Sequence, residues 1–89
     1  MSETPPLEEL IDFPSRFTFR ALCSSEPGLA LRLQAALEAA IGAAAEVSER
    51  PSSKGRFVSI HLAAEVTSAD SLRAGYAALR AVPGVKMTL

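Results

Sequence analysis

A short polar turn, Pro-Ser-Ser-Lys-Gly at residues 51–55, separates two segments that have strand patterns. The second segment, residues 56–66, places apolar side chains at every other position, which is typical of a half-buried strand. The first segment, residues 44–50, is a weaker strand of the same kind. Gly55 is expected to supply the positive φ of a short hairpin loop. The two strands are therefore predicted to pair antiparallel.

Helical patterns flank this hairpin on both sides. Residues 24–28 carry helix-start signals, namely serine hydroxyls able to cap, an acid and a proline. The helix that follows is predicted to end at Gly42 in a left-handed conformation. Residues 67–70 resemble a capping box and start a second helix. Alternating segments at residues 16–23 and 85–89 predict a first and a last strand.

The resulting order, β-α-β-β-α-β, predicts an α+β, ferredoxin-like sandwich. Right-handed crossovers place the first and third strands in the centre of a four-stranded antiparallel sheet of order 4-1-3-2, with both helices on one face. Gly75 lies inside the second helix, where glycine costs about 1 kcal/mol relative to alanine. It is therefore expected to mark close packing against the sheet.

The same patterns predict which side chains form the core between sheet and helices. In the strands they are Phe17, Phe19, Ala21, Cys23, Ala45, Val47, Val58, Ile60, Leu62, Ala64, Val66, Val85, Met87 and Leu89. In the helices they are Leu29, Leu33, Leu37, Ala40, Ile41, Leu72, Tyr76, Leu79 and Val82. Arg32, Gln34 and Glu38 are expected to face away from the core.

Residues 13–89 are predicted to form this single domain, preceded by a mobile N-terminal arm at residues 1–12. The arm is acidic and contains prolines, and it lacks the basic and apolar regions of a signal peptide. Cys23 is the only cysteine, so no internal disulfide can form. We therefore expect a cytoplasmic protein.

The charge balance argues against nucleic-acid and membrane partners. Nine basic and ten acidic residues give a formal net charge of −1, which offers no attractive field to nucleic acid or an anionic bilayer. The longest apolar-leaning run, residues 35–45, contains Glu38 and is far shorter than the about 20 residues that a membrane-spanning helix needs. We expect neither kind of partner.

No constellation of residues in the sequence predicts catalysis, a metal site or a cofactor. His61, the only histidine, falls on the open face of the sheet and lacks the other members of a zinc or Ser-His site. Cys23 falls on the inward face, where a small buried hydrophobe is expected rather than a nucleophile. An RNA-recognition module needs two or three aromatic side chains on the open face, and the third strand offers only Phe57. We therefore predict a protein that is not an enzyme.

The loop at residues 25–30, Ser-Glu-Pro-Gly-Leu-Ala, resembles the Asp-x-Pro-Gly-x-Leu stretch of ACT regulatory domains. In those domains the loop backbone and the helix N-terminus hold a small carboxylate, usually across a dimer interface. The resemblance implies unpaired backbone N–H groups at the helix start and a ligand site at Ser25, Pro27, Gly28 and Leu29. An ordinary helix start explains the same residues, and Glu26 would repel an anion. Both interpretations stay open.

Three stretches together resemble the YbeD-like family of small bacterial proteins of unknown function. They are Phe-Pro-x-x-Phe-Thr-Phe-Arg at residues 13–20, Pro-Ser-Ser-Lys-Gly-Arg-Phe-x-Ser-Ile at 51–60, and Val-Lys-Met-Thr-Leu at 85–89. The resemblance implies a ferredoxin-like fold similar to ACT-type domains, a cytoplasmic location and no established catalytic residues. The motif residues that could form an interaction surface are Phe13, Pro14, Phe17, Pro51, Ser52, Ser53, Lys54 and Gly55.

The sequence therefore predicts a non-enzymatic regulatory or protein-interaction module with an unknown protein partner. Leu22, Phe57 and Ala63, with the stems of Arg20 and Lys86, could form an exposed apolar patch. The alternative is an ACT-like domain that senses an amino acid or small carboxylate, and RNA binding is the function that the sequence favours least. The chain is expected to be a monomer or a weak homodimer.

Overall fold

The computed structural model describes residues 13–51 and 55–88, and the predicted mobile arm at residues 1–12 lies outside them. The elements follow the predicted order β-α-β-β-α-β. They are β1 (Ser15–Ser24), α2 (Leu29–Ile41), β2 (Ala45–Pro51), β3 (Phe57–Val66), α3 (Ala69–Arg80) and β4 (Val85–Thr88).

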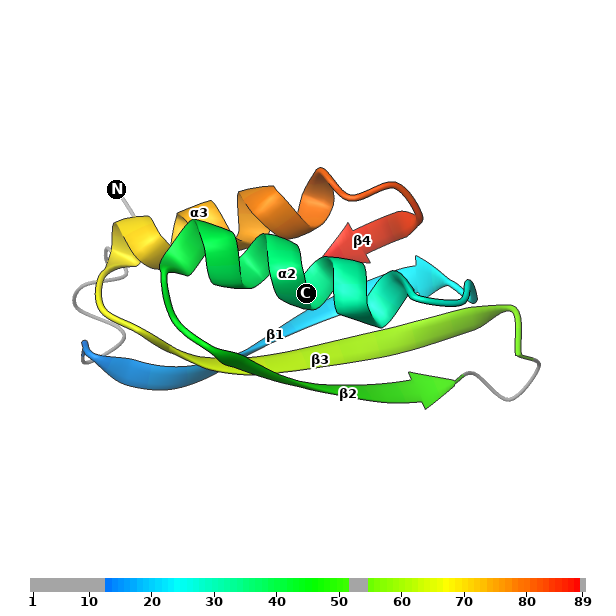
Figure 1. Cartoon of the computed structure of the whole chain (residues 1–89), viewed down its shortest axis with the longest axis horizontal. Helices are drawn as coiled ribbons and strands as arrows, with labels where there is room; N and C mark the ends of the chain where they lie inside the picture. The colour runs from blue at the N-terminus through cyan, green and yellow to red at the C-terminus, as the bar shows by residue number, and fades with distance from the viewer. Residues whose placement is uncertain (1–12, 52–54, 89) are drawn as a thin grey trace, which may run out of the picture.

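The strands form one antiparallel sheet in the order β2-β3-β1-β4, which is the predicted order 4-1-3-2 viewed from the other end. The central pair, β1 and β3, runs from Ser15 opposite Val66 to Ser24 opposite Phe57. Both helices lie on the same face of the sheet, and no described element covers the opposite face, which we call the open face (Figure 1). The α+β, ferredoxin-like prediction is confirmed.

The core fills the space between the sheet and the two helices, as the alternation predicted. Its fully buried members include Phe19, Leu33, Leu37, Ile60, Leu62 and Leu79. Among the predicted core residues, Ala40 is exposed in the last turn of α2, and the longer side chain of Ile41 packs against the core there instead. Burial of these side chains is the main term that stabilises a domain of this size.

Gly75 lets α3 approach both the sheet and α2. A Cβ atom at this position would lie 2.8 Å from Cε2 of Phe19 and 2.9 Å from Cδ1 of Leu37. Real Cβ atoms do not approach other carbons so closely. The close packing predicted from this glycine is confirmed.

The two helices start in different ways. At α3 the hydroxyl of Ser68 accepts a hydrogen bond from the backbone N–H of Ser71 over 3.1 Å, so a hydroxyl caps the helix as expected, but one residue after the Thr67 of the predicted capping box. At α2 the expectation of a serine cap is wrong: the N-cap is Gly28, with φ of 77°, and it makes no side-chain cap. Ser24 and Ser25 lie too early in the chain to cap α2. Their backbone N–H groups bond instead to neighbouring loops.

Met87 was predicted to face the core, and this is wrong, because half of its surface is exposed. Leu22 lies opposite Met87, whereas the next residue of β1, Cys23, lies opposite Val85. One step along β1 therefore corresponds to two steps along β4, which is a β-bulge at Lys86. The extra residue reverses the alternation, so that Val85 packs against the core and Met87 joins Leu22 on the open face.

Candidate functional site

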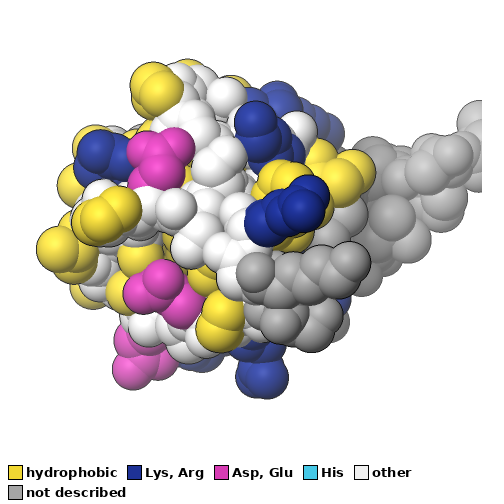
Figure 2. Space-filling model, turned by 90° about the vertical axis from the view of Figure 1, so that its right-hand side faces the viewer, with side chains coloured by type: hydrophobic (Ala, Val, Ile, Leu, Met, Phe, Trp, Pro, Cys, Tyr) yellow, Lys and Arg dark blue, Asp and Glu magenta, His cyan; other side chains and the backbone are white. Residues whose placement is uncertain are grey.

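The fold brings three loops together at one end of the molecule (Figure 1). The backbone N–H of Ser25 donates to the carbonyl oxygen of Arg56 over 3.1 Å, which joins the β1–α2 loop to the hairpin. The N–H of Ser24 donates to the carbonyl oxygen of Gly84 over 2.9 Å, which joins it to the α3–β4 turn. Figure 2 views this end, where basic, acidic and hydrophobic side chains are interspersed.

The β1–α2 loop holds the residues that the ACT-like resemblance singled out. Ser25, Pro27 and Gly28 are exposed, whereas Leu29 is buried in the core. The backbone N–H of Leu29 donates to the carbonyl oxygen of Glu26 over 3.4 Å, so the expectation that it is unpaired is wrong. The Glu26 carboxylate, at the same loop, lies 3.4 Å from the guanidinium of Arg32.

The hairpin motif is described only at its two ends. Pro51 closes β2 and is exposed, and Gly55 has the predicted positive φ, at 74°. Ser52, Ser53 and Lys54 lie outside the described residues. The glycine satisfies the turn geometry for which it was singled out.

The other family motif lies at the opposite end of the sheet. Phe13 and Pro14, joined by a cis peptide bond, precede the start of β1, where Ser15 pairs with Val66. Phe17 packs edge-to-face on Phe19, with ring centroids 5.0 Å apart. The structure therefore does not bring the two motifs into one site, and the aromatic side chain of Phe17 belongs to the core packing.

An apolar patch lies on the open face, at the end where the three loops meet. It consists of Leu22, Phe57 and Met87, of which Phe57 is 40% exposed and Met87 50% exposed. Leu22 lies opposite Met87 across β1 and β4, and Phe57 is the diagonal neighbour of Leu22 across β1 and β3. Leu22 and Phe57 were expected from the sequence. Ala63, also expected, lies opposite Thr18, four residue pairs along β3 from Ser59, the partner of Leu22, and it borders a different feature.

That second feature is a shallow hollow of about 350 Å³ on the open face. It is lined by Thr18, Glu46, Val47, Ser48, His61 and Ala63. The Nε2 atom of His61 lies 3.1 Å from the hydroxyl oxygen of Ser59, one of its neighbours on the same face of β3. The prediction that the imidazole lies on the open face is confirmed.

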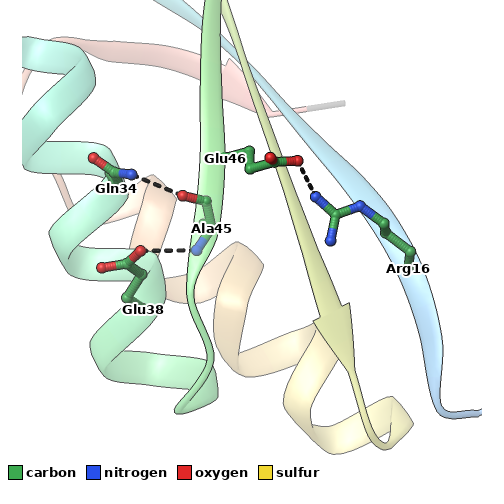
Figure 3. A network of polar contacts seen from close by, with 5 residues as sticks. All are labelled: Arg16, Gln34, Glu38, Ala45 and Glu46. Carbon is green, nitrogen blue, oxygen red and sulfur yellow. Dashed lines mark hydrogen bonds and ion pairs between the residues drawn. The ribbon is translucent and has the colours of Figure 1, made fainter.

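The outer edge of the sheet is partly closed by α2 (Figure 3). The side-chain amide of Gln34 donates to the carbonyl oxygen of Ala45, and the carboxylate of Glu38 accepts from the N–H of the same residue, each over 2.7 Å. Arg16 and Glu46 form an ion pair nearby, across the open face. Gln34 and Glu38 were expected to face away from the core, and no sequence pattern indicated that they would hold the first residue of β2.

The titratable groups give no sign of catalysis in the part of the chain that the structure describes. Burial, with a smaller contribution from Glu26, raises the pKa of the Cys23 thiol, which disfavours the nucleophilic thiolate. Burial likewise raises the pKa of Tyr76, against the opposing charge of Arg20.

Residues 13–51 and 55–88 contain no cluster of three or more metal-ligating side chains. No helix within these ranges is long and apolar enough to cross a membrane.

Comparisons with known proteins show which family the chain resembles. A family model described as "Protein of unknown function (DUF493)" matches residues 8–89. A UPF0250 protein of Leptothrix cholodnii is 32% identical over an alignment of 94 residues, which covers 100% of each chain. A UPF0250 protein of Shewanella putrefaciens is 32% identical over 82 residues, or 92% of this chain and 93% of that one.

A solved structure supports the fold. The solution structure of protein HP0495 from H. pylori superposes with a TM-score of 0.77 and covers 99% of this chain and 90% of that chain. The two sequences are 18% identical, so the likeness concerns the fold alone.

Proposed function

The chain belongs to the DUF493 family of proteins of unknown function, in agreement with the YbeD-like resemblance, and from its geometry we propose that it is a non-enzymatic regulatory or protein-interaction module. The observation that carries this proposal is the apolar patch of Leu22, Phe57 and Met87. Large side chains that cluster on an exposed surface are typical of protein-interaction sites. Aromatic residues and methionine are also enriched in such interfaces.

The position of the patch supports a docking role. It lies on the side of the sheet that neither helix covers (Figure 1), so a partner can reach it without any rearrangement of the core. Arg20 is exposed two residues before Leu22, on the same face of β1, and supplies a charged rim. An apolar centre with a charged rim is the usual arrangement of a transient interface.

Affinity capture with matched variants tests this proposal. Tagged wild-type protein is compared with Phe57→Ser, Met87→Ser and Leu31→Ser as bait in native lysate, with partners identified by mass spectrometry. Leu31 is the control, because it is a large apolar residue that is 67% exposed on α2, away from the patch. We expect Leu31→Ser to retain the partners of the wild type and the two patch variants to lose at least one of them.

A quantitative measurement then follows with the purified partner. Removing an anchor at the centre of an interface typically costs more than about 1 kcal/mol, which corresponds to a loss of at least about fivefold in affinity. Equal binding by the wild type and all three variants would exclude the patch as the docking surface.

The second candidate function is an ACT-like response to an amino acid or small carboxylate at Ser25, Pro27, Gly28 and Leu29. The observation that favours it is the start of α2. The N-cap there is Gly28, so no side chain caps the backbone N–H groups of the first turn. Amide shifts confined to residues 25–31 during titration with amino acids would support it. Gly28→Val should then abolish those shifts.

A further inference from the structure

Four polar side chains form a compact block on the open face of β2 and β3. Ser48 lies opposite His61, and two residues further along Arg50 lies opposite Ser59. All four point away from the helices, because the residues between them, such as Val47 and Ile60, pack in the core. Neighbouring strands lie about 4.8 Å apart, so the four side chains lie within reach of one small ligand.

The positive charge of this block has no counterion among the described residues. Arg50 is exposed, and its guanidinium makes no ion pair or hydrogen bond with residues 13–51 or 55–88. The nearest acid on the same face of β2 is Glu46, which is already paired with Arg16. Glu49 lies opposite Ile60 and so belongs to the other face of the strand.

The other three members of the block supply neutral hydrogen-bonding groups. Nε2 of His61 and the hydroxyl oxygen of Ser59 are 3.1 Å apart. If Nε2 carries the proton and donates it to this oxygen, the hydroxyl of Ser59 is left to donate to a ligand. Ser48 and His61 also border the hollow of about 350 Å³, which Glu46 lines as well, whereas Arg50 and Ser59 lie outside its lining.

We propose that this block, which we call the Arg50 block, binds the phosphate group of a small molecule. The planar guanidinium of Arg50 matches two phosphate oxygens at once. The hydroxyls of Ser48 and Ser59 donate to the remaining oxygens, and His61 orients the second of these hydroxyls. The site does not include Leu22, Phe57 or Met87, so it can fail or succeed independently of the apolar patch.

Titration of the full chain with inorganic phosphate, followed by NMR at constant pH and ionic strength, tests the proposal. We expect saturable shifts of the Arg50 side-chain Nε–H and of the amides of Ser48, Ser59 and His61. The imidazole nitrogen shifts of His61 should also move toward those of the Nε2–H tautomer. Acetate at equal concentration should give no saturable shifts, because a carboxylate has fewer oxygens to accept from the guanidinium and the two serine hydroxyls.

Variants separate this site from general surface charge. Arg50→Gln should weaken phosphate binding at least tenfold, because the variant lacks the charged, two-pronged donor for the phosphate oxygens. Arg80→Gln is the matched control, because Arg80 is an exposed, basic residue on α3. Shifts that rise linearly without saturation, that survive in Arg50→Gln, or that fall equally in Arg80→Gln would overturn the proposal. Saturable binding of acetate with equal affinity would overturn the assignment to phosphate.

Discussion

The side-chain amide of Gln34 on α2 donates a hydrogen bond to the backbone carbonyl oxygen of Ala45, at the start of the edge strand β2, over 2.7 Å. One helical turn further on, Glu38 accepts from the N–H of the same residue. Both backbone groups of Ala45 are thus held by side chains, in a strand that lies at the edge of the sheet formed by the described residues. Unpaired edges invite pairing with other chains, so this contact protects the sheet as well as anchoring it.

Removing this contact should destabilise the domain. We expect Gln34→Ala and Glu38→Ala each to lower the free energy of unfolding by about 1–2 kcal/mol, because a partly buried backbone group loses its partner. Urea unfolding measures the change. Arg32→Ala is the control on the same helix, since its exposed ion pair with Glu26 should contribute well under about 1 kcal/mol. Equal losses in all three variants would show that the contact has no special role.

Gly75→Ala should destabilise the protein although alanine is the better helix former. The added Cβ would meet the ring of Phe19 at 2.8 Å and the side chain of Leu37 at 2.9 Å. Overpacking of this kind costs about 1–3 kcal/mol, which outweighs the roughly 1 kcal/mol gained in helix propensity.

A second substitution on α3 separates the two effects. Ala74→Gly, at an exposed neighbouring position, should cost only the propensity term of about 1 kcal/mol. Urea midpoints compare the two variants. A more stable Gly75→Ala variant would contradict the close approach of α3 to Phe19.

The free energy of unfolding should fall at alkaline pH because of Cys23. Burial, and to a smaller extent Glu26, raises the pKa of the folded thiol above its ordinary value of 9.0. The unfolded thiol therefore loses its proton first as the pH rises, and the unfolded state then binds fewer protons than the folded state. The stability that the neutral thiol contributes is fully present below pH 9.0 and declines above it, up to the raised pKa of the folded state.

Urea unfolding at several pH values from neutral to alkaline measures this dependence. Cys23→Ala should be less stable at neutral pH, because it removes a buried side chain, but its stability should depend less steeply on pH above 9.0. Some slope should remain, because burial also raises the pKa of Tyr76. Identical slopes in the two proteins would exclude the thiol as a contributor.

The sequence predicted the sheet order and most of the core because alternation and helical periodicity report burial directly. The turn at Gly55 and the start of α3 at a hydroxyl cap were also predicted, since each depends on residues with a distinctive local preference, although the cap is Ser68 and not Thr67. The bulge in β4 was missed because alternation alone cannot reveal how two strands are aligned. The contacts of Gln34 and Glu38 were missed because they depend on the position of β2 relative to α2, which no local pattern encodes.

The same limits apply to the candidate sites. Phe57 was predicted to be exposed, but Met87 joined it only through the bulge. Of the Arg50 block, the sequence analysis placed His61 on the open face, while Ser48 and Arg50 came to adjoin it and Ser59 through the register of β2. The residues of a site on a sheet face are thus chosen by strand register, which acts over long sequence separations.

The bulge itself predicts opposite behaviour for two residues of β4. Met87→Lys should change the free energy of unfolding by no more than about 0.5 kcal/mol, because Met87 is half exposed on the open face. Val85→Lys should cost more than about 1 kcal/mol, because Val85 lies opposite the buried Cys23 and packs against the core, where a charged group loses hydration. In a strand without a bulge both residues would point inward, and both substitutions would be costly. Urea unfolding of the two variants therefore decides between the two registers, and comparable losses would rule out the bulge.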